Sequence, residues 1–128
     1  MILNHVAFVC GSEKNSDRFY HDLLGLDKLQ SKIIPPSLSQ RIFNSDLEFK
    51  LINYGNDDIK FEIFISEQFK PPEIRIDHVC LEIDGIDGFL EKCDSIGVEV
   101  LRIPRGELFL IFIKDFDGNQ FEIKQLAS

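Results

Sequence analysis

An internal repeat constrains the fold of this chain more than any other feature of its sequence. Short motifs occur in the same order in the first and in the second half of the chain. In the first pair, Asn4-His5-Val6-Ala7-Phe8 matches Asp77-His78-Val79-Cys80-Leu81. In the second pair, Leu24-Gly25-Leu26-Asp27 matches Ile96-Gly97-Val98-Glu99. In the third pair, Phe61-Glu62-Ile63 matches Phe121-Glu122-Ile123. One match could arise by chance, whereas several in register indicate two copies of one structural unit. We therefore expect a single domain over residues 1–128, built from two modules at about 1–70 and 74–128.

The pattern of apolar residues predicts the element order β-α-β-β-β in both modules. Ser12 can cap a helix that ends before Gly25, and Pro35-Pro36 predicts a loop. The expected strands cover 2–9, 28–34, 40–54 (with a turn at 44–46) and 59–66, then 73–83, 98–103, 107–113 and 120–125, and the second helix covers 84–96. One helix covers only one face of a four-stranded sheet, and the other face stays open until a second copy meets it. We therefore expect an α+β fold in which two tandem βαβββ modules form a curved eight-stranded mixed sheet.

Strand alternation places one histidine and one glutamate of each module on the open face. Alternate residues of a strand share a face, and the apolar neighbours of these four residues suit the face that packs under the helix. A lone histidine or glutamate in a strand is more often an ordinary hydrogen-bonded or solvent-facing residue. Here the residues occur at equivalent positions of the repeat, and a charged residue between two large apolar ones needs a partner. The sequence therefore predicts that the sheet surrounds a metal site with the ligands His5, Glu62, His78 and Glu122.

Two imidazoles and two carboxylates form a mixed nitrogen and oxygen donor set. Such a set suits one divalent ion, and Ni, Co, Zn, Mn and Fe all remain open. Four protein ligands on a six-coordinate ion would leave two positions for water or for a small-molecule substrate. Arg105, beside Gly106 in a predicted turn, is the cation we expect to meet an anionic group of that substrate.

The charge and composition of the chain exclude several other classes of function. The chain carries 14 Lys and Arg against 22 Asp and Glu, a formal net charge of −8. A surface this negative repels phosphate backbones, so we expect no nucleic-acid partner. No apolar run approaches the roughly 20 residues of a membrane span, and no signal peptide is visible, so we expect a cytoplasmic protein without membrane contact. The 3 cysteines form no C-x-x-C motif, which argues against a thiolate metal site.

Two further segments carry a resemblance to a known family. Phe19-Tyr20-His21-Asp22-Leu23-Leu24-Gly25-Leu26 and Asp115-Phe116-Asp117-Gly118-Asn119-Gln120-Phe121-Glu122 are similar to the first helix exit and the closing turn and last strand of the vicinal oxygen chelate superfamily. That group includes glyoxalase I, fosfomycin-resistance proteins, methylmalonyl-CoA epimerase and extradiol dioxygenases. The resemblance covers essentially the whole chain. It implies that the four predicted ligands occupy the ligand positions of glyoxalase I. It also implies a metal-dependent lyase or isomerase, in which Glu122 acts as the base and Glu62 is its counterpart on the other side.

The same resemblance also shows where this chain departs from glyoxalase I. Those enzymes usually carry an arginine and an asparagine, for the carboxylates of glutathione, where this chain has Val9 and Ser66. We therefore expect weak glyoxalase I activity. A ligand-sequestering protein of bleomycin-resistance type and an Fe(II) dioxygenase remain alternatives on the same scaffold. The family often pairs modules from two chains, and Pro71-Pro72 in the short linker favours this arrangement, so we expect a homodimer.

Overall fold

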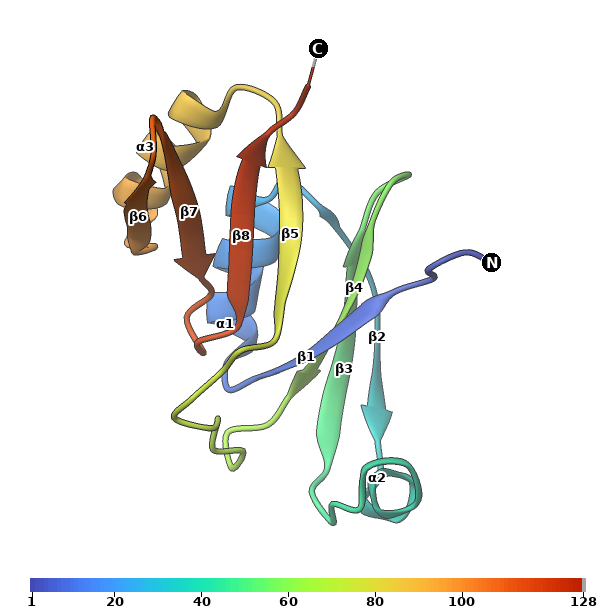
Figure 1. The fold of residues 1–128 in the computed structure, drawn as a ribbon. Coiled ribbons are helices and arrows are strands. Elements are labelled where there is room, and N and C mark those ends of the chain that lie inside the picture. The colour runs from blue at the N-terminus through green and yellow to red at the C-terminus, as the bar shows by residue number, and fades with distance from the viewer. Residues whose placement is uncertain (128) are drawn as a thin grey trace. The chain divides into compact units, whose positions relative to one another are not determined.

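The computed structural model describes residues 1–127 and divides the chain into two compact units, Met1–Pro71 (unit 1) and Pro72–Ser128 (unit 2) (Figure 1). Each unit contains one four-stranded mixed sheet. The strand order is β1-β4-β3-β2 in unit 1 and β5-β8-β7-β6 in unit 2. In each sheet the first and last strands of the unit are parallel neighbours, and the remaining neighbours are antiparallel. The two units therefore share one topology, as the sequence repeat predicts.

Unit 1 consists of β1 (Val6–Cys10), α1 (Glu13–Ser16), η1 (Asp17–Leu23), β2 (Asp27–Ile34), α2 (Pro36–Phe43), β3 (Phe49–Gly55) and β4 (Lys60–Ile65). Helix α1 begins where the Ser12 hydroxyl accepts a hydrogen bond from the Asn15 amide at 3.1 Å, as expected for a serine cap. It continues directly into η1, a turn of wider π-helix, and the chain leaves the helix through Gly25 at φ +74°.

The helical segment of unit 1 packs on one face of its sheet through aromatic side chains. Tyr20 in η1 lies 5.4 Å from Tyr54 of β3 and 5.5 Å from Phe61 of β4, measured between ring centroids. Tyr20, Tyr54 and Phe61 are fully buried. Phe61 and Ile63 thus face the helix, as predicted, and Glu62 between them points to the opposite face.

Unit 2 consists of β5 (His78–Ile83), α3 (Ile86–Ile96), β6 (Val100–Arg105), β7 (Leu108–Lys114) and β8 (Gln120–Gln125). Helix α3 ends at Gly97, which adopts φ +82°. Exposure along β5 alternates strictly, with His78, Cys80 and Glu82 exposed and their neighbours half-buried. Phe121 and Ile123 of β8 are buried on either side of Glu122.

The segment 40–54 corrects one prediction. Its first part is helical, because α2 covers Pro36–Phe43 and β3 begins only at Phe49. Pro36 occupies the start of the helix, where its missing N–H and fixed φ are tolerated. Asn44 ends the helix in the left-handed conformation, at φ 55° and ψ 38°. The double proline therefore starts a helix, and the expected loop at Pro35-Pro36 is wrong.

The expectation of an α+β fold with two tandem βαβββ modules is confirmed. The eight strands are divided between two four-stranded sheets, one in each unit, instead of forming one continuous sheet. Within residues 1–127, no helix combines the length and the apolar character needed to cross a membrane.

Candidate metal-binding site

The two predicted histidine–glutamate pairs occupy equivalent positions in the two units, although His78 begins β5 and His5 lies directly before β1. Ala7 of β1 lies opposite Glu62 of β4, and His5 precedes Ala7 by two residues. Cys80 of β5 lies opposite Glu122 of β8, and His78 precedes Cys80 by two residues. Because side chains two residues apart share a face of a strand, each histidine lies diagonally beside its glutamate on the face away from the helix.

Each unit brings its own pair together. The His5 Nε2 atom lies 3.4 Å from Glu62 Oε1, and the His78 Nε2 atom lies 3.8 Å from Glu122 Oε1. The glutamate side chains are largely sheltered, with 19% of Glu62 and 16% of Glu122 exposed, and the histidines are more open. The histidine–glutamate pairs therefore form two matching half-sites, one in unit 1 and one in unit 2.

The second ring nitrogen of each histidine fixes the tautomer that a metal ligand needs. His5 Nδ1 donates to the Asn4 side-chain oxygen at 2.7 Å, and His78 Nδ1 donates to the Ile76 carbonyl oxygen at 2.9 Å. A proton on Nδ1 leaves the lone pair on Nε2, the ring nitrogen that lies near the carboxylate. Metal-bound histidines in proteins are usually oriented by such a bond.

The donor atoms also have the spacing that a shared ion requires. Ligand atoms bound at about 2.0–2.2 Å in tetrahedral or octahedral geometry lie roughly 3.0–3.5 Å apart. The 3.4 Å separation of His5 and Glu62 falls in this range, and His78 and Glu122 at 3.8 Å need only a small side-chain rotation. Each half-site, taken by itself, therefore fits a divalent ion, which its glutamate would hold by the carboxylate and its histidine by Nε2.

The surroundings of the two half-sites differ in a way that sequence reasoning missed. Asn53 of β3 lies opposite Glu62, and its Oδ1 atom is buried without a hydrogen-bond partner among residues 1–127. Phe112 of β7 takes the same place opposite Glu122, and its ring packs edge-on at 5.6 Å from the ring of His78. One half-site is thus flanked by an amide and the other by an aromatic ring. Aligning the third strands of the two repeats would have shown this difference.

The glutamate of each half-site lines a hollow of its own unit. In unit 1, His5 and Glu62 lie in a groove walled by α2. In unit 2, Glu122 and Arg105 line a hollow beside β7, where β7 pairs with β8 only over Phe112–Lys114. Arg105 therefore lines the same hollow as Glu122. This position agrees with the expected contact of Arg105 with an anionic group of the substrate, and that contact stays a prediction.

Several other polar residues have structural partners. His21 Nδ1 lies 2.7 Å from the Leu26 carbonyl oxygen, so this histidine holds the helix exit. The Ser66 hydroxyl accepts a bond from the Gln68 amide at 3.2 Å, and Val9 packs against the apolar cluster of Ile34, Phe49, Leu51 and Phe64.

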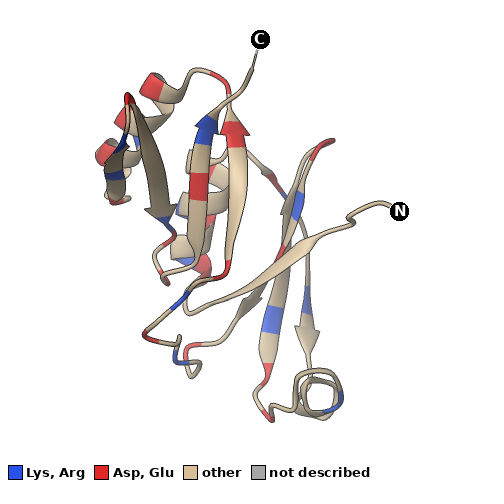
Figure 2. Cartoon of the chain, in the orientation of Figure 1, with Lys and Arg blue, Asp and Glu red and all other residues tan. Residues whose placement is uncertain are grey.

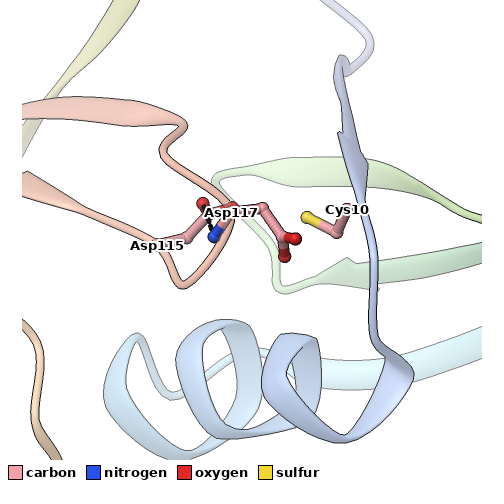
Figure 3. Close-up of side chains that lie close together, drawn as sticks. All are labelled: Cys10, Asp115 and Asp117. Carbon is pink, nitrogen blue, oxygen red and sulfur yellow. Dashed lines mark hydrogen bonds between the residues drawn. The ribbon is translucent and has the colours of Figure 1, made fainter. Parts of the chain in front are cut away.

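The turn before β8 is stabilised by hydrogen bonds to the side chain of Asp115, a residue of the turn. Figure 3 shows the Asp117 amide donating to Asp115 Oδ1 at 2.9 Å. Asp115 also accepts from the Asn119 amide at 2.9 Å and from the Asn119 side chain at 2.7 Å, and Arg75 donates to Asn119 Oδ1. Cys10, drawn in the same figure, ends β1 in unit 1. The Asp115 turn thus fixes the start of the strand that carries Glu122.

Charged residues are interspersed over the strands, helices and loops of the chain (Figure 2). Acidic residues outnumber basic ones by 22 to 14, and lysines and arginines occur singly among them. This distribution gives the described chain no basic stripe of the kind that tracks a phosphate backbone.

Comparison with known proteins places this arrangement in a family. A model of the Glyoxalase/Bleomycin resistance protein/Dioxygenase superfamily matches residues 2–123. A probable lactoylglutathione lyase of Synechocystis sp. is 24% identical over 136 residues, which cover 100% of this chain and 98% of the relative. A probable chloroplastic lactoylglutathione lyase of Arabidopsis thaliana is 25% identical over 127 residues, or 93% of this chain, and the match spans 34% of that longer protein.

Solved structures agree at the level of the fold. A glyoxalase family protein of Enterococcus faecalis has a TM-score of 0.71 at 20% identity, with 95% of each chain covered. A variant of the fosfomycin resistance protein FosX of Listeria monocytogenes, complexed with Mn(II) and 1S,2S-dihydroxypropylphosphonic acid, has a TM-score of 0.73 at 19% identity, covering 99% of this chain and 93% of that one. Because the family model matches nearly the whole sequence and the fold agrees, this chain belongs to the Glyoxalase/Bleomycin resistance protein/Dioxygenase superfamily, the vicinal oxygen chelate group.

Proposed function

We propose that this protein is a metal-dependent lyase or isomerase of glyoxalase type. The observation that carries the proposal is the repetition of one histidine–glutamate pair at equivalent positions of the two units. In this proposal His5, Glu62, His78 and Glu122 supply the four ligands of one divalent ion, from one chain or from two. Its identity among Ni, Co, Zn, Mn and Fe stays open. The substrate is a small molecule with two neighbouring oxygens.

The four residues have separate roles in this proposal. A bound divalent ion supplies Lewis acidity toward a substrate oxygen, which makes a neighbouring C–H more acidic. Glu122 accepts that proton and returns it to the adjacent carbon, and Glu62 is its counterpart on the other side. The two histidines hold their Nε2 atoms in place through their Nδ1–H bonds. Arg105 contacts an anionic group of the substrate from the hollow that also contains Glu122.

The relatives support this class of function. The Synechocystis and Arabidopsis proteins bear the name of a lactoylglutathione lyase. The FosX variant binds Mn(II) together with a compound that has hydroxyl groups on adjacent carbons. A protein that only sequesters a ligand has no need of two matched histidine–glutamate pairs, so the pairs favour catalysis over sequestration.

Metal content is the first test. We expect stoichiometric divalent metal in protein purified without added ions, and a rise in thermal stability when Ni, Co, Mn or Zn is added to the metal-free protein. At a free metal concentration of 100 times Kd, binding adds about 2.7 kcal/mol to the free energy of unfolding. Absence of both metal and thermal shift would favour the sequestering protein.

Alanine variants of two proposed ligands and of a histidine outside the site form a matched set. His5→Ala and Glu122→Ala should lose metal and activity and keep the fold, because both side chains face away from the helix-packed core. His21→Ala should keep full metal content and lose only about 0.5–1.5 kcal/mol of stability with its hydrogen bond to Leu26. Equal metal content in His5→Ala and the unmodified protein would remove His5 from the ligand set.

A further inference from the structure

The groove beside the half-site of unit 1 has a helical apolar wall, formed by α2, and unit 2 has no helix at the equivalent place. It has a volume of about 330 Å³ and contains His5 and Glu62. Leu38, Ile42 and Phe43 of α2 form one side of it. In unit 2 the equivalent strands β6 and β7 are joined by a turn at Gly106, with no helix between them. The wall is therefore specific to the first module.

The C-terminal end of helix α2 packs on the open face of the sheet through Phe43. The ring of Phe43 packs edge-on against Phe64 and Phe49, at centroid distances of 5.2 and 6.4 Å. Leu38 and Ile42 lie four residues apart, so they share one side of the helix. They line the groove but remain 38% and 59% exposed. Leu38 and Ile42 thus remain partly exposed to solvent in the same groove as the two proposed metal ligands His5 and Glu62.

The groove also contains one cation. Lys32 of β2 lines it, opposite Leu51 in the register of β2 and β3. Among residues 1–127, no carboxylate lies within ion-pair distance of Lys32. The groove therefore combines two proposed metal ligands, a lysine outside any ion pair and an apolar wall. This combination complements a molecule with an oxygen-rich, electronegative head and an apolar tail.

We propose that this groove binds an aliphatic or aromatic substituent of the substrate, so that the substrate class is an amphiphilic compound with vicinal oxygens. This inference rests on the function proposed above. The oxygens lie at the metal held by His5 and Glu62, Lys32 faces their negative charge, and the substituent lies against Leu38 and Ile42. Substrates with such a tail bind better than those with a hydrogen or a methyl group in its place.

Alkyl hydroxamates test the proposal, because a hydroxamate chelates a metal ion through two adjacent oxygens and its chain can be lengthened one carbon at a time. Affinities of the series from acetohydroxamate to octanohydroxamate would be measured by calorimetry on the full, metal-loaded protein. We expect each added methylene to tighten binding by about two- to fourfold until the groove is filled.

Substitution of the wall provides the specific readout. In the double variant Leu38→Ser, Ile42→Ser the gain with chain length should be lost, while the affinity for acetohydroxamate stays unchanged. Ile33→Ser is the matched control, because Ile33 on β2 is 56% exposed, comparable to Ile42, and does not line the groove. This variant should keep the full dependence on chain length.

The outcomes separate the two proposals. A protein that binds no metal, or no acetohydroxamate when metal-loaded, overturns the proposed function and this inference with it. A protein that binds acetohydroxamate without any gain from longer chains overturns the inference alone. If the wall instead covers a second copy of the chain, the double variant shifts the sedimentation equilibrium toward monomer and leaves the chain-length dependence intact, which also overturns the inference.

Discussion

The resemblance to glyoxalase I aligns Val9 and Ser66 with the residues that usually hold the carboxylates of glutathione in those enzymes. Val9 packs in an apolar cluster, and the Ser66 hydroxyl is engaged by the Gln68 amide. Neither can replace a charge-assisted bond from arginine, which contributes about 1.5–3 kcal/mol. We expect turnover of the methylglyoxal–glutathione adduct to be at least ten- to a hundredfold below that of a true glyoxalase I, about 1.4–2.7 kcal/mol. Assays with Ni, Co and Zn added separately to the metal-free protein measure this, and turnover in the usual enzyme range with any of them contradicts it.

Glu13 gives unit 1 a dependence on pH. Hydrogen bonds from Lys28 and Lys50, both at 2.7 Å, lower the pKa of Glu13 below its ordinary value. A lowered folded-state pKa stabilises the fold above the unfolded pKa of about 4.3, and this contribution is lost as the pH falls through the folded value. Because the side chain is about a third exposed, we expect Glu13→Gln to lower the free energy of unfolding by only about 0.5 kcal/mol at pH 7.

Urea unfolding at pH 7 and at pH 3 tests the Glu13 prediction, since the difference between Glu13→Gln and the unmodified protein should become smaller at the lower pH. Glu67→Gln is the control. Glu67 is exposed after β4 and has no ion pair within residues 1–127, so the same change of charge should leave stability unaltered at both pH values. A stability difference for Glu13→Gln that is equally large at pH 7 and pH 3 would assign its effect to packing.

At the scale of the secondary-structure element, helix α2 depends on how it ends. Asn44 adopts φ 55°, and its side-chain oxygen accepts a bond from Gln40 at 2.8 Å. Asn44→Ala and Asn44→Gly both remove that bond, but only glycine accepts the left-handed backbone freely. We expect the alanine variant to be less stable than the glycine variant by about 1 kcal/mol in urea unfolding. Equal stabilities would show that the helix can end elsewhere.

Sequence patterns predicted most elements of this fold, and α2 shows why some were missed. The alternation around Glu62 and Glu122 predicted their face correctly, because large apolar neighbours admit only one orientation. Gln40–Phe43 is too short to show a helical period, and its polar and apolar residues suit a strand equally well. The helix was decided by Pro36 at its start and by contacts of Phe43 with Phe49 and Phe64, residues distant in the sequence. Because the sequence patterns did not predict α2, they did not predict the groove that this helix forms either.

At the scale of the whole molecule, we expect a homodimer. The face of each sheet that carries a histidine–glutamate pair is the face away from the helix of its own unit, and an open sheet face needs a covering layer. Sedimentation equilibrium at micromolar concentration should give twice the mass of one chain. A monomer mass would contradict the prediction.

Complementation tests whether a site is shared between chains. If His5 and Glu62 of one copy bind the same ion as His78 and Glu122 of the other, a mixture of His5→Ala and His78→Ala chains contains dimers with one intact ligand set. Such a mixture, refolded together, should regain part of the metal content that each variant lacks alone. No regain on mixing assigns all four ligands to one chain.

The uneven pairing of β7 makes unit 2 the easier unit to open. β3 pairs with β4 from Lys50 to Gly55, whereas β7 pairs with β8 only from Phe112 to Lys114. The hairpin of β6 and β7 is therefore tethered to the sheet at one end, and its tip around Gly106 can swing out at a lower free energy than global unfolding. Backbone amides near that tip should exchange their hydrogens with solvent ahead of those in β3 and β4. Arg105 lies at this tip and Glu122 lies on β8, so we expect the same motion to widen and narrow the hollow that the two residues line.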